Sequence, residues 1–299
     1  MRPNTAVRSA PLLRALAALA GVSLAGVSLA GALSAGAASG PFEKVHCLKY
    51  AGGRVPIDAF VAGAKPDREI DAAALICVAQ RPGQTVVLDT GYVDQKYGAE
   101  FFTGAWTDVG DRLREIGVDP AKVDLVTLGH LHWDHAGGTS RFPNAKFVMQ
   151  RRELEFAAVD VPGNPFVTGG FRLEDVVEAL RLKWDGRLEL VDGDAERWQD
   201  ALDLYLTPGH TAGTMTVCLE TAKGRVCYTS DAVYLYENLE KNLPLGIAVL
   251  PQEMFESYAK IRRVLRGGKL VPGHDISVFD DAAAHGFRRV SERVVAIVE

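Results

Sequence analysis

Six consecutive residues, 130–135, constrain the possible structure of this 299-residue chain more than any other feature. They read His130-Leu131-His132-Trp133-Asp134-His135 and bring three imidazoles and one carboxylate together. Unpaired ionisable side chains are costly to bury, whereas imidazole and carboxylate are preferred ligands of divalent metals. The two histidines at alternate positions can share one ion, and the Asp-His pair can reach a second. The segment therefore predicts a metal site in a packed loop rather than a solvated polar turn.

Three further ligand candidates follow at wide spacing. His210 and His274 each follow a Pro-Gly pair, and Asp231 follows a strand-like run. Glycine and proline allow the tight turns that present an imidazole at a fixed angle. With the first segment these positions use five of the chain's seven histidines. We assign the other two, His46 and His285, to structural roles.

The hydrophobic pattern predicts alternating strands and helices. The predicted strands are residues 45–50, 73–80, 85–88, 125–128, 146–150, 202–206, 215–220, 225–229 and 269–271. Helices are expected at 109–116 and 254–265, each stopped by a glycine, and a weaker helical pattern covers 173–182. The run 294–298 fits a strand or a helix end. Thr90 and most of the ligand candidates come within a few residues after a predicted strand, as expected for loops held at the ends of a rigid sheet.

These residues, together with Leu88-Asp89-Thr90-Gly91 upstream, resemble the metallo-β-lactamase superfamily over nearly the whole chain after residue 37. The resemblance implies an α/β (α+β) fold, a four-layer αββα sandwich with the metals at one edge of the paired sheets. It also implies how the ligands divide. One ion would be held by His130, His132 and His210, the other by Asp134, His135 and His274, with Asp231 bridging both. Asp89 would orient the ligands.

Within the superfamily the sequence is most similar to the N-acyl homoserine lactonases. The similarity rests on the continuation to Ala136-Gly137-Gly138, on the run from Ser230 to Tyr234, and on Gly273-His274-Asp275. It implies that a metal-bridging hydroxide attacks the carbonyl of a lactone ring. Tyr234 would stabilise the developing oxyanion, and Asp134 would carry a proton to the leaving alkoxide. A packing role for Tyr234 stays open, because Tyr236 lies nearby.

Several other activities share parts of this motif. An exported organophosphate or aryl-ester hydrolase would have the same metal site, and a thioesterase resembling glyoxalase II would keep all seven ligands. A β-lactamase is disfavoured by Asp231, and a flavodiiron-type redox protein by His132, where glutamate would be expected. A metal-binding module without activity would be expected to have lost ligands.

The expected cofactor is a pair of divalent metal ions. Zinc is the default expectation, and cobalt, manganese or iron would suit the same mixed ligands. The expected partner is a small ester or lactone, and a homodimer is left open. Five aromatic residues could cover the site or belong to the core: Phe101, Phe102, Trp106, Phe166 and Phe171.

Residues 1–37 have the pattern of a secretory signal peptide. Three arginines precede an apolar run rich in Ala, Gly and Leu, which ends in Ala35-Gly36-Ala37. A membrane anchor is the competing interpretation, but the small-residue ending favours cleavage. We therefore expect a single hydrolase domain over 38–299, periplasmic or secreted and free of the membrane. The formal charge of −5, more acidic still without the leader, disfavours a nucleic-acid partner, and none is expected.

Four cysteines, Cys47, Cys77, Cys218 and Cys227, all lie in strand-like apolar runs without a CxxC spacing. An oxidising compartment allows disulfides between them. The sequence favours buried, unpaired cysteines that pack as small hydrophobic residues. Cys218 and Cys227 flank the expected hairpin turn 221–224, which makes them the first pair to test.

Overall fold

Two β-sheets form the centre of the computed structural model, which describes residues 39–164 and 167–299. Within these residues the larger sheet has eight strands, in the order β12 (Arg288–Arg289), β13 (Val294–Val298), β1 (Lys44–Pro56), β2 (Glu69–Arg81), β3 (Gln84–Leu88), β4 (Leu125–Thr127), β5 (Lys146–Gln150) and β6 (Leu188–Val191). The smaller sheet has five, in the order β11 (Lys269–Val271), β10 (Gly224–Tyr228), β9 (Met215–Thr221), β8 (Leu202–Leu206) and β7 (Ala195–Gln199). The predicted leader, 1–37, lies outside the described residues.

The helices are mostly short. They are α1 (Ile57–Phe60), α2 (Gln95–Gly98), α3 (Val109–Arg114), α4 (Trp133–Ala136), α5 (Arg151–Glu155), α6 (Leu173–Trp184), α7 (Tyr236–Lys241), α8 (Pro251–Leu265) and α9 (Ser277–Asp280). Single turns of 3-10 or π type are η1 (Pro120–Lys122), η2 (Thr139–Arg141), η3 (Phe156–Asp160), η4 (Thr168–Gly170) and η5 (Ser230–Ala232). None of these described helices is long and apolar enough to cross a bilayer.

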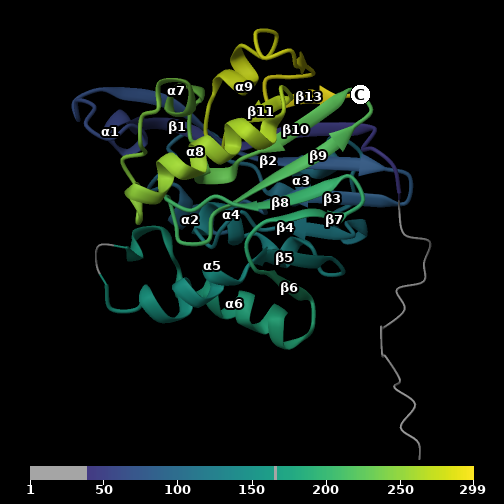
Figure 1. Cartoon of the computed structure of the whole chain (residues 1–299), viewed down its shortest axis with the longest axis horizontal. Coiled ribbons are helices and arrows are strands. Elements are labelled where there is room, and N and C mark those ends of the chain that lie inside the picture. The colour runs from purple at the N-terminus through teal and green to yellow at the C-terminus, as the bar shows by residue number, and fades with distance from the viewer. Residues whose placement is uncertain (1–38, 165–166) are drawn as a thin grey trace, which may run out of the picture. The chain divides into compact units, whose positions relative to one another are not determined.

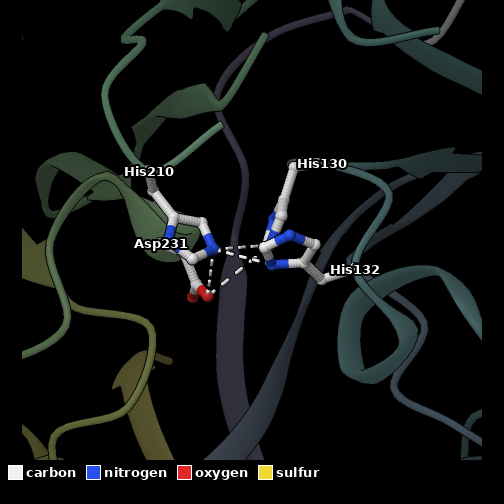
Figure 2. A group of neighbouring side chains, drawn as sticks. All are labelled: His130, His132, His210 and Asp231. Carbon is white, nitrogen blue, oxygen red and sulfur yellow. Dashed lines mark hydrogen bonds and ion pairs between the residues drawn. The ribbon is translucent and has the colours of Figure 1, made fainter. Parts of the chain in front are cut away.

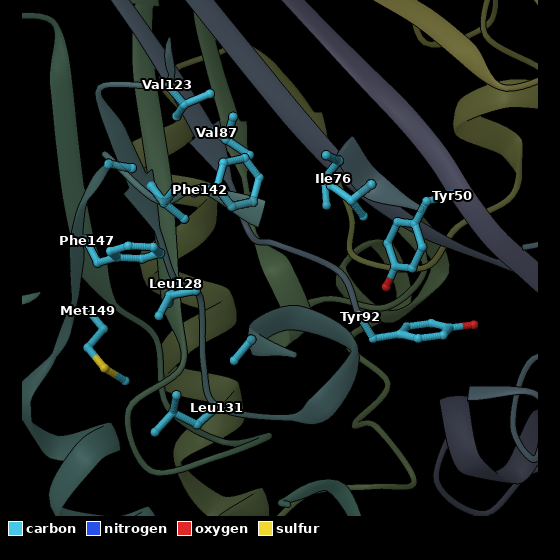
Figure 3. Close-up of a cluster of buried hydrophobic side chains, with 14 of the residues drawn as sticks. Tyr50, Ile76, Val87, Tyr92, Val123, Leu128, Leu131, Phe142, Phe147 and Met149 are labelled. Carbon is cyan, nitrogen blue, oxygen red and sulfur yellow. The ribbon is translucent and has the colours of Figure 1, made fainter. Parts of the chain in front are cut away.

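Strand alternation assigns the two faces of the larger sheet to different cores. In β2, Ala74, Ile76 and Val78 belong to the core cluster that also contains residues of helices α3 and α6, and Figure 3 shows Ile76 within this cluster. The intervening Ala73, Leu75 and Cys77 pack against the smaller sheet. This period of two is the expected consequence of opposite side-chain directions along a strand.

The far face of the smaller sheet is covered by α8, which crosses the strands in Figure 1. Val264 of α8 packs against Tyr205, Cys218 and Cys227. The layers are therefore helix, sheet, sheet, helix, and the predicted αββα sandwich is confirmed.

The prediction of unpaired cysteines was wrong. Cys47 and Cys77 are joined by a disulfide, and so are Cys218 and Cys227. Each pair lies directly opposite in neighbouring antiparallel strands, with Cα atoms 4.1 Å apart. The expected burial is correct, but the cross-strand register that brings the sulfur atoms together is not visible in the spacing.

Candidate metal centre

The first ligand loop connects β4 to α4. His130 and His132 lie in the loop, and His132 caps α4 in an extended conformation. Asp134 and His135 then fall in the first turn of that helix, which turns both side chains toward the same interior. All four are buried. The helix is only four residues long, so it is the loop and its contacts that fix these side chains.

Gly129 lets this loop approach the smaller sheet. A Cβ atom at this position would lie 2.3 Å from Oγ of Ser230, so only glycine fits. Its backbone N–H donates to Oδ1 of Asp89 at 2.6 Å. The close contact places the loop beside η5, which carries Asp231.

One group of donors consists of His130, His132, His210 and Asp231 (Figure 2). Nε2 of His210 lies 3.2 Å from Nε2 of His130 and 2.8 Å from Nδ1 of His132. Oδ2 of Asp231 lies 3.3 Å from Nε2 of His210. Three ring nitrogens and one carboxylate oxygen thus surround one small volume.

The second group consists of Asp134, His135 and His274. Oδ2 of Asp134 lies 3.4 Å from Nε2 of His135 and 3.6 Å from Nε2 of His274. Asp231 also contributes here, because its Oδ1 lies 3.1 Å from Nε2 of His135 and 3.2 Å from Nε2 of His274. Oδ2 of Asp231, which faces the first group, also lies 3.3 Å from Nε2 of His274, so the carboxylate lies between the two groups as expected of a bridging ligand.

Hydrogen bonds on the remote ring nitrogens orient three of the histidines. These bonds are from His135 Nδ1 to Asp89 Oδ2 at 2.7 Å, from His210 Nδ1 to Ile247 O at 2.9 Å, and from His274 Nδ1 to Ala73 O at 2.8 Å. A carboxylate or carbonyl oxygen only accepts, so Nδ1 carries the proton in each case. When the ring is neutral, Nε2 is therefore the lone-pair donor, which is the arrangement seen around metal-bound histidines.

Asp89 collects four hydrogen bonds although its side chain is fully buried. Besides His135 and the Gly129 amide, it accepts from the hydroxyls of Tyr228 and Ser230, each at 2.8 Å. Its backbone adopts φ +63°, which is uncommon for a residue other than glycine. The predicted orienting role of Asp89 matches this geometry.

Glu153 is a buried carboxylate that the sequence analysis missed. Oε1 accepts from the amide of Leu131, between the first two ligand histidines, at 2.9 Å. Oε2 accepts from Oγ1 of Thr211 at 2.7 Å and from the amide of Gly213 at 2.8 Å, both just after His210. Glu153 therefore ties two ligand loops together. It lies at the start of α5 in no recognisable motif, so only the folded chain reveals it.

The protonation of the cluster reflects burial and mutual contact. Burial, with neighbouring imidazoles, holds the pKa of His130 and His132 well below the ordinary value, so these rings are neutral. Burial alone would raise the pKa of Asp231, but His135 and His274 beside it more than offset this and hold that pKa well below its usual range. Burial alone would lower the pKa of His135 and His274, but the carboxylates beside them more than offset this and raise both pKa values, so cations that bind here would displace protons from these two rings.

Two buried atoms in the cluster lack a hydrogen-bond partner, Nε2 of His135 and Oδ1 of Asp231. An orphaned buried polar atom costs free energy unless something else satisfies it. Both atoms point into the space shared by the donor groups, and a cation there would satisfy both. The donor set therefore fits two divalent metal ions, as the sequence predicted.

The donors form the floor of a cavity of about 610 Å³. His132, Asp134, His210, Asp231 and His274 line its base, and Tyr234 stands beside them. Apolar side chains make the walls: Val55, Phe60, Phe101, Phe102, Trp133, Ile247 and Val249. None of the described lining residues is a lysine or an arginine, and Glu100 adds an acidic group.

The sequence left open whether five aromatic residues cover the site or belong to the core. Of these, Phe101 and Phe102 line the cavity. Phe171 packs against the ring of His132, with centroids 4.5 Å apart. Trp106 stacks on Tyr92 in the core cluster, and Phe166 lies outside the described residues.

Tyr234 lies against the metal ligands. Its hydroxyl oxygen is 3.3 Å from Nδ1 of His210, and its ring packs on His274 and Phe60. Because Nδ1 of His210 already donates to the carbonyl of Ile247, it has no lone pair for the phenol proton. Burial and the Asp231 carboxylate, which accepts a hydrogen bond from the phenol, raise the pKa of Tyr234 well above its ordinary value, so the hydroxyl keeps its proton at the base of the cavity.

The fold thus brings all seven predicted ligands together. His46 and His285 lie elsewhere, as expected for structural residues. Nε2 of His46 pairs with Glu299 at 3.1 Å, and the ring of His285 stacks on Tyr236 at 4.0 Å.

The two donor groups and the paired sheets are those expected of a metallo-β-lactamase-like metal-dependent hydrolase. Comparison with known proteins assigns the chain to the same family. Residues 72–274 match the Metallo-beta-lactamase superfamily model. The chain belongs to this superfamily.

Two curated relatives are each 30% identical over 55% of this chain. They are N-acyl homoserine lactonase AttM of Azorhizobium caulinodans and N-acyl homoserine lactonase AiiA of Bacillus thuringiensis subsp. kurstaki. The matched region covers 62% of the first and 60% of the second, so the chain spans less than two thirds of the length of these relatives.

Solved structures of similar fold include a quorum-quenching N-acyl homoserine lactone lactonase, with a TM-score of 0.70 and 22% identity. The match covers 85% of this chain and 99% of that one. AidC, a dizinc quorum-quenching lactonase, gives a TM-score of 0.60 at 18% identity and covers 79% of this chain and 90% of its own. These structures are similar in fold.

Proposed function

We propose that this protein is a metal-dependent hydrolase that opens lactone rings, with N-acyl homoserine lactones as its substrates. The observation that carries the proposal is that Tyr234 and five of the seven donors line the base of one apolar cavity, with the other two donors grouped beside them. The names of AttM and AiiA, both N-acyl homoserine lactonases, support the choice of substrate.

The two donor groups indicate which residues would hold each metal ion. His130, His132 and His210 would hold one ion, Asp134, His135 and His274 the other, and Asp231 would contact both. Bound there, two divalent ions make water nucleophilic at neutral pH and polarise the carbonyl under attack. We propose zinc, since its preferred ligands include histidine nitrogen and carboxylate oxygen, and AidC is described as dizinc.

Tyr234 and Asp134 have separate roles in the proposed reaction. The Tyr234 hydroxyl donates a hydrogen bond to the oxygen that gains negative charge when the ring carbonyl is attacked. Asp134, at the base of the cavity, takes the proton of the attacking water and passes it to the ring oxygen as the C–O bond breaks. The product is a hydroxy acid with the ring open.

The walls favour a neutral, partly apolar substrate. The apolar side chains of the walls can cover an acyl chain, whereas no lysine or arginine among the described lining residues is available for an anionic group. The carboxylates of β-lactams and of glutathione thioesters would meet Glu100 and two site aspartates instead. An uncharged organophosphate or aryl ester would meet no such repulsion and is the alternative substrate class.

We further propose that residues 1–37 direct export and that 38–299 act as a single domain in the periplasm or outside the cell. Two disulfides support this, because such bonds persist in oxidising compartments.

The substrate class is tested by assaying one protein preparation, of measured metal content, against a panel of substrates. The panel contains acyl-homoserine lactones of several chain lengths, simple lactones, a paraoxon-type triester, nitrocefin and S-lactoylglutathione. We expect the highest kcat/KM for an acyl-homoserine lactone. Fastest turnover of the triester would assign the alternative class, and fastest turnover of nitrocefin or the thioester would overturn the inference that this cavity disfavours anionic substrates.

A further inference from the structure

Helix α6 has two apolar faces, and the core uses only one. Val176, Ala179 and Leu182 are buried against the larger sheet. On the other side Leu173 is 74% exposed, Leu180 44% and Trp184 90%. Val177 lies between them and is half-buried. We call Leu173, Val177, Leu180 and Trp184 the α6 stripe.

The spacing of the α6 stripe is that of a helix that packs against another helix. Its members follow at intervals of four, three and four residues, which places them within a narrow arc of the helix surface. This is the alternation of a and d positions in a coiled coil. Since Val176, Ala179 and Leu182 already anchor α6, its fold gives no reason for a second apolar row. An exposed apolar row of this size marks an interaction surface.

The charges beside the stripe indicate what covers it. Glu174 and Glu178 lie in the first half of α6, and Arg181 and Lys183 lie in the second half. A second α6 running antiparallel would place acidic residues against basic ones at both ends. A parallel copy would instead oppose like charges.

The antiparallel register also matches the apolar residues. With a two-fold axis between Glu178 and Ala179, Leu173 faces Trp184 of the second copy and Val177 faces Leu180. In the same register Glu174 and Arg181 of the second copy lie on the same flank of the stripe, so an acidic residue faces a basic one. Layers of this kind, each joining an a position to a d position, are those of an antiparallel helix pair, and a two-fold interface requires such self-complementarity.

We propose that the α6 stripe is the interface of a homodimer, in which two α6 helices pack antiparallel. A twelve-residue helix is roughly 18 Å long, and this contact alone is smaller than the interface of a tight complex. The dimer is therefore weak and depends on concentration, with a Kd on the order of micromolar. A membrane is a poorer partner, because the charges of α6 are mixed and the chain is acidic overall, whereas membrane-surface helices carry a basic polar face.

Sedimentation velocity of the purified, metal-loaded protein, from low to several hundred micromolar, tests the proposal. We expect a monomer–dimer equilibrium that Leu180→Ser and Trp184→Ser each weaken at least tenfold. Val290→Ser is the matched control, because Val290 is 47% exposed and lies outside α6, and it should leave the equilibrium unchanged. Circular dichroism and metal content verify that each variant is folded.

A charge exchange tests the antiparallel register itself. Glu174→Lys and Arg181→Glu should each weaken the dimer, and the double variant should restore it. A double variant as weak as the single ones would overturn the register. Three results would overturn the proposed interface. They are a monomer at every concentration, a dimer that the stripe variants do not weaken, and binding of monomers to phosphatidylglycerol vesicles through Trp184.

Discussion

Nδ1 of His135 lies 2.7 Å from Oδ2 of Asp89, and this contact joins a ligand of one donor group to a carboxylate that also holds Gly129, Tyr228 and Ser230. One side chain thus sets the ring orientation of a ligand and the distance between the loop after β4 and the loop after β10.

Asp89→Asn should reduce metal affinity by roughly ten- to a hundredfold, the usual effect of losing the partner of a metal-bound histidine. The amide keeps the shape but replaces one accepting oxygen with a donor. Chelator competition with zinc and with cobalt measures the change. Asp67→Asn, at an exposed position, is the control. Equal affinities in both variants would remove Asp89 from the support of the site.

Tyr234→Phe should slow lactone opening more than tenfold while bound metal stays the same. The hydroxyl is expected to stabilise the oxyanion, and loss of such a donor has an effect of this order or larger. Steady-state rates and metal analysis of the same preparation separate the two effects. Unchanged turnover would leave Tyr234 with a packing role only, against Phe60 and His274.

Glu153→Gln should destabilise the fold by about 2–4 kcal/mol, because donors that now meet a carboxylate would meet an amide N–H₂ group. Metal affinity should fall as well, since the loops after β4 and β8 lose their common acceptor. Urea unfolding and chelator competition report the two effects. Glu155→Gln, exposed on the same helix, should change neither.

Removing the disulfides should destabilise the protein unequally. The bonded cysteines are 30 residues apart for Cys47 and Cys77, and 9 for Cys218 and Cys227. Loop-closure entropy predicts losses of roughly 3–4 and 2–3 kcal/mol for the two Cys→Ala pairs. Urea unfolding of each double variant gives the values. A larger loss for the shorter loop would contradict the chain-entropy account.

Asp175→Asn should stabilise the protein at neutral pH. Burial raises the pKa of Asp175 to about 6, and its Oδ2 has no hydrogen-bond partner. The folded state therefore binds this proton more tightly than the unfolded chain does, so stability is lost as pH rises from about 4 to about 6. We expect the variant to gain about 1–2 kcal/mol above pH 6 and nothing below pH 4. Unfolding curves of both proteins across this range test the sign, and a gain that persists at pH 4 would contradict it.

Sequence patterns predicted the elements that carry strong periodicity. The expected strands 146–150, 202–206 and 269–271 match β5, β8 and β11, and the helix expected at 173–182 is α6. Charged and polar residues interrupt β6 and β7, so these edge strands gave no signal. The ambiguous run 294–298 is a strand because Val294 to Val298 pair with β1, a contact between the two ends of the chain.

The ligands were predictable because their residue types are improbable anywhere but at a metal site. Glu153 and the disulfides were not, because their roles depend on neighbours distant in sequence. Glu153 meets Gly213 across 60 residues, and Cys47 meets Cys77 only through the register of β1 with β2. The local sequence pattern does not reveal contacts between residues that are distant in sequence.

The metal ligands and the walls of the cavity come from different parts of the fold. His210 is held by the backbone carbonyl of Ile247, whose side chain points into the cavity wall and takes no part in that hydrogen bond. The side chain at 247, and those of α1 and of the segment after α2, can therefore be substituted without changing the positions of the ligand histidines. The metal ligands can thus stay in place while the walls, and with them the substrates that fit, change.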